Sequence, residues 1–193
     1  MPSARFRTIC WTPTWNKVQE GVGLEHLLLS DRSADSVVLA LDDERGPFRL
    51  AYRLVWDDSW RLRQAEMTVA TERSTHSLNL ETDGLGHWQH DDGRAFDELE
   101  GCLDIDIWPT PFTNSFPIRR DPMPVGERKE FRMAWVFAPD LTVQPQPQAY
   151  TRLADRTYLF ENLDGSGFRA RLPVDEHGVV LDYPGFFRRV REE

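Results

Sequence analysis

The most regular feature of this chain is an alternation of hydrophobic and polar residues with a period of two. It is clearest in residues 48–56, 62–69, 131–137 and 168–174. Because successive side chains of a strand point to opposite faces, the pattern predicts antiparallel strands with one face buried and one in water. Residues 37–41 are hydrophobic at every position, which predicts a strand covered on both faces.

Turn residues separate these segments. Asp-Gly or His-Gly pairs at 83–84, 92–93, 164–165 and 177–178 supply the positive φ of tight turns, and Pro145 and Pro147 indicate an irregular or edge segment. Residues 17–29 and the C-terminal tail are the places where a short helix is expected. Many short strands need covered edges. The sequence therefore predicts a mainly antiparallel all-β fold, a spiral β-roll or open barrel with at most one or two short helices.

Length and charge narrow the class of protein. We expect a single β-roll domain spanning residues 1–193. The net charge of −9 argues against a nucleic-acid partner, because phosphate binding depends on clustered cations. The longest aliphatic run, residues 37–41, is far shorter than the roughly 20 residues of a membrane span, and the N-terminus does not read as a signal peptide. A soluble, cytoplasmic protein is expected.

Residues 97–120 concentrate the polar chemistry of the chain. Asp104 and Asp106 share one face of a predicted strand. The following residues 108–117 contain three prolines, which predicts a rigid, largely extended loop carrying Thr110 and Asn114. This loop leads to the basic pair at 119–120.

Several interpretations of this segment stay open. At roughly 3.3 Å per residue the Cα atoms of Asp104 and Asp106 lie about 6.6 Å apart, a spacing that permits acid/base chemistry on a sugar. The two acids could instead form structural salt bridges with Arg119 and Arg120, or contact a ligand. A guanidinium near a concave face could also hold an anionic head group.

The same segment resembles the signature of a known family. Cys-Leu-Asp-Ile-Asp at 102–106 and Thr-Pro-Phe-Thr-Asn-Ser-Phe-Pro-Ile-Arg-Arg at 110–120 are similar to motifs of a bacterial glycolipid-binding family, first catalogued as a domain of unknown function. Residues 83–88, 148–150 and 182–187 carry further matches. The resemblance implies a β-roll similar to bacterial lipoprotein carriers, and a lipid or glycolipid as partner.

We therefore expect a non-catalytic protein that holds an amphipathic ligand in a β-roll cavity. Aromatic faces would carry the apolar part, and polar groups the head. No cofactor, metal site or catalytic residue is predicted, and the oligomeric state is left open. The alternatives are an enzyme that uses the aspartate pair, and a structural or interaction protein without a small ligand. The expected ligand-binding residues are Asp104, Asp106, Thr110, Asn114, Arg119, Arg120, Trp88, Trp108 and Tyr150.

Overall fold

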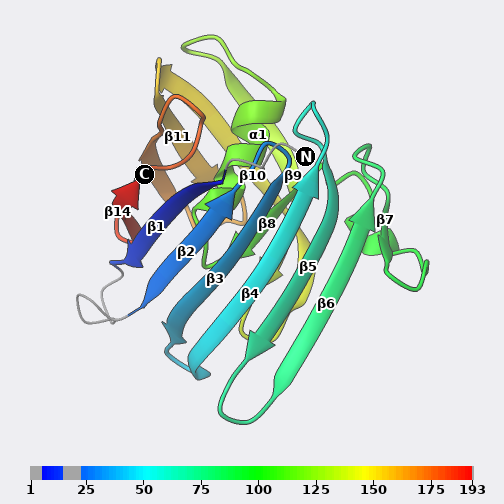
Figure 1. Cartoon of the computed structure of the whole chain (residues 1–193). Helices are drawn as coiled ribbons and strands as arrows, with labels where there is room; N and C mark the ends of the chain where they lie inside the picture. The colour runs from blue at the N-terminus through cyan, green and yellow to red at the C-terminus, as the bar shows by residue number, and fades with distance from the viewer. Residues whose placement is uncertain (1–5, 15–22, 193) are drawn as a thin grey trace.

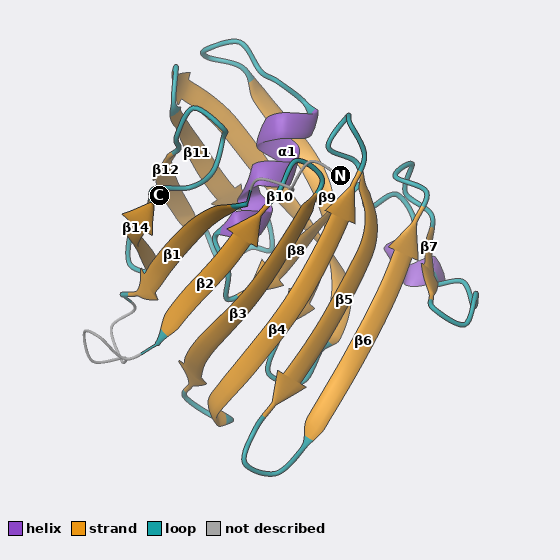
Figure 2. Cartoon of the chain, in the orientation of Figure 1, coloured by secondary structure: helices purple, strands orange, loops and turns teal. Residues whose placement is uncertain are grey.

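The computed structural model describes residues 6–14 and 23–192, which form two β-sheets joined by short helical segments (Figures 1 and 2). In spatial order, the larger sheet contains β13 (Asp182–Tyr183), β14 (Phe187–Glu192), β1 (Arg7–Pro13), β2 (Leu24–Leu29), β3 (Ser33–Asp42), β4 (Gly46–Trp56), β5 (Leu62–Ala70), β6 (Thr75–Thr82) and β7 (Trp88–His90). The smaller sheet contains β12 (Arg169–Pro173), β11 (Thr157–Asn162), β10 (Thr142–Ala154), β9 (Arg128–Phe137) and β8 (Asp104–Trp108). The helical segments are η1 (Asp97–Leu99), η2 (Phe112–Asn114) and α1 (Ser115–Arg120).

The sheets confirm the predicted fold class. Neighbouring strands pair antiparallel except β8 and β9, which are parallel. The larger sheet curls into a half-barrel, with the smaller sheet behind it and α1 between them (Figure 1). The last strand, β14, pairs with the first, β1, so both ends of the chain meet in one sheet. Of the helical segments in the described part of the chain, none has the length and apolar character needed to cross a bilayer.

The alternating pattern explains how the core forms. In β4, Leu50 and Leu54 are buried, whereas Arg49 and Arg53 on the opposite face are exposed. Each large apolar side chain buried in this way contributes about 1.5–3 kcal/mol, which holds the strand in a single register.

The smaller sheet is buried on both faces over part of its area. One face packs Ile105, Ile107 and Val136 against the larger sheet. The other face packs Met133 and Tyr150 with Ile118 of α1 in a second cluster. The residues between β7 and β9 thus close the space between the sheets on one side.

The prediction that residues 37–41 are covered on both faces is wrong. Val37 and Leu39 are 38% and 48% exposed on the outer face of β3, whereas Val38 and Ala40 are buried. The run of hydrophobic residues predicted a layer over the outer face of β3, and the described part of the chain does not provide one. The strand is therefore buried on one face only, as is common in antiparallel sheets.

The expectation of an extended loop through residue 117 is also wrong, because this stretch forms η2 and the first half of α1. Pro117 lies in the first turn of α1, where a backbone N–H has no acceptor within the helix, so its missing donor costs little. Arg119 and Arg120 therefore project from a helix rather than from a strand.

Neither expected helix lies where it was placed. Residues 24–29 form β2, and the tail forms β14. Residues 17–22 of the first segment lie outside the described residues.

Candidate functional site

Strand β8 sets the geometry of the candidate site. Its side chains alternate as predicted: Ile105 and Ile107 enter the core between the sheets, and Asp104 and Asp106 point to the other face. Parallel pairing with β9 places Asp104 beside Met133 and Asp106 beside Trp135. The two carboxylates nevertheless have different surroundings, and the difference decides what each can do.

Asp104 is fully buried in an ion pair with Arg120 of α1. The guanidinium donates Nε to Oδ1 at 2.9 Å and Nη2 to Oδ2 at 2.7 Å, and it also lies over the ring of Phe131. Burial raises the pKa of Asp104, against the lowering effect of Arg120. A bidentate pair of this kind fixes both side chains. It clamps α1 onto β8.

Asp106 is half-buried and makes no such ion pair. Thr113 Oγ1 donates to its Oδ1 at 3.0 Å, and Gln148 Nε2 donates to its Oδ2 at 2.6 Å. Burial raises the pKa of Asp106 despite these two donors. This carboxylate stands beside open space.

That space is a cleft of about 290 Å³ between the smaller sheet and the β13–β14 end of the larger one. Aromatic, amide and carboxylate groups make up most of its wall. The lining residues are Asp106, Ile107, Trp108, Pro109, Thr110, Asn114, Trp135, Gln144, Gln146, Gln148, Phe160, Asn162, Asp164, Phe168, Tyr183, Phe186 and Phe187.

Strand β10 supplies the amide floor of the cleft. Gln144, Gln146 and Gln148 alternate with Pro145 and Pro147, so all three amides share one face. The part of β10 that holds the prolines pairs with β9, and β11 joins only from Gln148 onward, which confirms the predicted edge character. Proline has no backbone N–H, but β11 does not pair with β10 at Pro145 and Pro147, so no hydrogen bond between strands is lost on that side.

The floor is ordered by its own hydrogen bonds. Gln146 Nε2 donates to Asn162 Oδ1 at 2.8 Å, and Asn162 Nδ2 donates to Asp164 Oδ2 at 2.8 Å. Gln148 is fully buried, and its Oε1 makes no hydrogen bond to the described residues. The floor thus keeps one free acceptor.

Aromatic rings form the walls. Phe168, Tyr183 and Phe186 pack together on the side of the larger sheet, with centroids 5.2–6.3 Å apart. On the opposite side, Trp108 stacks on Phe137 at 5.2 Å.

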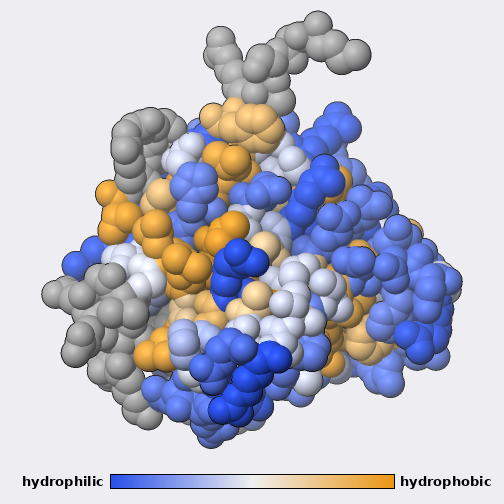
Figure 3. All heavy atoms as spheres, turned by 60° about the horizontal axis from the view of Figure 1, so that its bottom comes forward, coloured by the Kyte–Doolittle hydropathy of each residue, from blue (hydrophilic) through white to orange (hydrophobic). Residues whose placement is uncertain are grey.

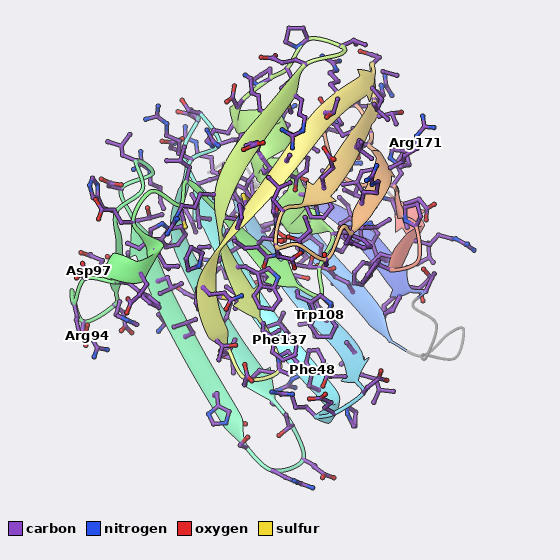
Figure 4. All side chains as sticks on the ribbon, turned by 180° about the vertical axis from the view of Figure 1, so that it is seen from behind. Phe48, Arg94, Asp97, Trp108, Phe137 and Arg171 are labelled. Atoms are coloured by element: carbon purple, nitrogen blue, oxygen red, sulfur yellow. The ribbon has the colours of Figure 1, made fainter. Side chains whose placement is uncertain are left out.

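The aromatic surface continues below the cleft. Phe48 lies 6.1 Å from Trp108, and Figure 4 shows Phe48, Trp108 and Phe137 together at the lower end of the two sheets. The same end, brought forward in Figure 3, shows apolar surface near its middle with hydrophilic residues around it.

A buried carboxyl beside the cleft was missed by the sequence analysis. Glu25 of β2 is fully buried, and its Oε1 accepts hydrogen bonds from Tyr52 at 2.6 Å, Thr110 at 2.8 Å and Ser36 at 2.9 Å. Burial raises its pKa from the ordinary 4.5 to about 7, against the lowering effect of the three hydroxyls. The sequence signal was the alternation of residues. If residues 24–29 form a strand, Glu25 points to the same face as Leu27 and Leu29.

The structure brings only part of the predicted site together. Asp106, Trp108, Thr110 and Asn114 line the cleft.

The other predicted residues lie outside the lining. Asp104 and Arg120 hold each other, and Arg119 is exposed with its guanidinium over Trp60. Tyr150 lies beneath the cleft and donates to Asn114 Oδ1 at 2.9 Å. Trp88 is the first residue of β7, and its Nε1 donates to the Cys102 carbonyl. Among the described residues, no group of three His, Cys, Asp or Glu side chains is arranged to hold a metal ion.

Comparison with known proteins identifies the family. Residues 12–189 match the family model described as "Putative glycolipid-binding", and the chain belongs to that family. It is also similar to the crystal structure of a DUF1089 family protein from Pseudomonas aeruginosa, with 48% identity and a TM-score of 0.86 over 92% of this chain and 98% of that one. No curated protein matches. The family expected from the sequence motifs is thereby confirmed.

Removing Arg120 tests the clamp on α1. We expect Arg120→Ala to lower the free energy of unfolding by about 3–5 kcal/mol, because it leaves the buried Asp104 carboxylate without its partner. Arg119→Ala, on the same helix but exposed, should cost no more than about 1 kcal/mol. Chemical denaturation measures both values. Equal losses in the two variants would contradict a clamp specific to Arg120.

Glu25 should make stability depend on pH. The folded state holds its proton more tightly than the unfolded chain, so its contribution is complete below about pH 4.5 and is lost as the pH rises through about 7. The loss is on the order of 3 kcal/mol. Glu25→Gln keeps an acceptor for the hydroxyls and should flatten the unfolding free energy over this window. Glu66→Gln, at an exposed position of β5, is the control and should keep the wild-type slope; a wild-type slope in Glu25→Gln would refute the assignment.

Proposed function

We propose that this protein binds an amphipathic, glycolipid-type ligand in the cleft and does not transform it. The family description supports a binding role. The observation that carries the proposal is the composition of the cleft, which joins aromatic faces to a row of side-chain amides along one wall. Small-molecule binding sites have this composition: their walls are mostly apolar, and a few polar groups fix the orientation of the ligand.

The two parts of the wall suit the two parts of such a ligand. Amides and the Asp106 carboxylate offer donors and acceptors to the hydroxyls of a head group. Aromatic rings offer flat apolar faces to sugar C–H groups or to the first methylenes of an acyl chain. The floor is ordered before a ligand arrives, which lowers the entropy lost on binding.

The size of the cleft limits how much ligand it covers. At about 290 Å³ it lies at the lower end of small-molecule sites, which range over about 300–1,000 Å³. It suits a head group and the beginning of a chain rather than a whole two-chain lipid. The remaining chain would follow the aromatic surface formed by Trp108, Phe137 and Phe48.

The geometry of the aspartate pair argues against the enzyme alternative. Acid/base chemistry on a glycosidic bond needs two carboxyl groups that flank one bound ring. Asp106 lines the cleft, but Asp104 is buried against Arg120 outside it. A structural role without a ligand would suit a fully filled interior, and the cleft with its free Gln148 acceptor favours binding instead.

Shortening an aromatic wall residue tests the proposal. We expect Trp135→Leu to weaken the binding of octyl β-glucoside, at concentrations below micelle formation, by about tenfold. A lost aromatic contact of about 1.4 kcal/mol accounts for that factor. Titration calorimetry gives the affinities.

Trp60→Leu is the matched control. Trp60 is half-buried like Trp135, but it stacks on Trp56 outside the cleft. Its replacement should leave the affinity within about twofold. Wild-type protein that binds no alkyl glycoside or other single-chain amphiphile would defeat the proposal, as would equal effects of the two variants.

A further inference from the structure

Among the described residues, the charges that line the cleft have only one sign. They are the acids Asp106 and Asp164, and no arginine, lysine or histidine is found among the described lining residues. The two guanidiniums considered for an anionic head group lie elsewhere, Arg120 against Asp104 and Arg119 over Trp60. An anionic head group would meet two carboxylates, with no cation from the described part of the wall. Sites for phosphate, sulfate or carboxylate groups instead supply arginine or lysine.

The free acceptor points to the same conclusion. Because a carboxylate accepts, the Gln148 amide is oriented with Nε2 toward Asp106 and Oε1 away from it. Oε1 is buried in a cleft-lining residue and has no donor among the described residues. A buried acceptor without a donor is unfavourable, so a ligand that donates to it gains affinity. A sugar hydroxyl donates, whereas a phosphate dianion, a sulfate or a carboxylate has no proton to give.

The side-chain amides of the cleft favour a sugar over a cationic head group. An aromatic wall with nearby carboxylates also suits a quaternary ammonium through cation–π contacts. Such a group donates no hydrogen bond, however, and would leave the buried Gln148 oxygen without a donor. The cleft amides belong to Asn114, Gln144, Gln146, Gln148 and Asn162. Each carries both donor and acceptor atoms, as a sugar hydroxyl does.

We infer that the head group recognised by the cleft is an uncharged sugar, and that the cleft discriminates against the same sugar when it carries an acid group. The inference rests on the proposed function and specifies its ligand. Hydroxyls would bind the Gln148 oxygen and the Asp106 carboxylate, and the ring would lie against the aromatic walls. Discrimination would come from Asp106 and Asp164, which no cation among the described lining residues offsets.

A matched pair of probes tests the inference. Octyl β-glucoside and octyl β-glucuronide share their tail and ring, and differ by one carboxylate in place of a hydroxymethyl group. We expect the glucuronide to bind at least tenfold more weakly at pH 7.5 and low salt, as measured by titration calorimetry below micelle formation. Octyltrimethylammonium bromide, which has the same tail and no hydroxyl, should bind more weakly than the glucoside.

A charge variant attributes the discrimination to the cleft. Asp164 is exposed at the β11–β12 turn, so Asp164→Asn should reduce the ratio of glucoside to glucuronide affinity at least threefold. Asp83→Asn changes a similar Asp-Gly turn near β7, outside the cleft lining, and should leave the ratio unchanged. Thermal melting curves of both variants establish that they fold.

The outcomes separate this inference from the proposed function. Equal or tighter binding of the glucuronide would overturn the inference and leave amphiphile binding intact. Tightest binding of the ammonium probe would overturn it in favour of a cationic head group. Binding of none of the three would remove the proposed function itself, and the inference with it.

Discussion

The structure of the site depends on the buried ion pair between Asp104 and Arg120. Asp104 is the first residue of β8 and Arg120 is the last residue of α1, and their bidentate contact fixes how the chain between them folds back. Three further hydrogen bonds hold the intervening residues: Thr113 donates to Asp106, Thr110 donates to Glu25, and Tyr150 donates to Asn114. A segment rich in proline has few backbone donors of its own, so side chains take over the role of a ladder.

This arrangement assigns different tasks to two similar residues. Asp104 and Asp106 are two positions apart on the same face, and sequence alone makes them equivalent. Helix α1 covers Asp104 and brings a guanidinium to it, whereas Asp106 lies beyond the helix and meets neutral donors from η2 and β10. The edge of α1 therefore separates the buried Asp104–Arg120 ion pair from the open cleft. One aspartate serves the fold, and the other remains beside the cleft.

Local pattern was sufficient to predict most of the strands, because alternation reports directly on one-sided burial. It was sufficient as well for the shared face of Asp104 and Asp106 and for the cleft-lining Thr110 and Asn114. It failed where the outcome depends on distant elements. No local pattern encodes the second layer that would have to cover Leu39. The partner of Arg120, a ligand or Asp104, depends on a helix that the three prolines had argued against. The amides of β10 were visible as an alternation of glutamine with proline, yet their place in a cleft became clear only with β8 in the same sheet and β13 in the other.

The free Gln148 oxygen connects stability with binding. This buried acceptor has no donor among the described residues, and a buried acceptor without a donor costs about 1–3 kcal/mol. The fold tolerates it because the same amide anchors Asp106 and because the clusters on both faces of the smaller sheet supply far more than this amount. Under the proposed function, a ligand that donates to this oxygen would supply the missing hydrogen bond, so part of the binding energy would come from satisfying a group that is already buried. The same glutamine would then serve both the order of the cleft, through Asp106, and the binding of the ligand.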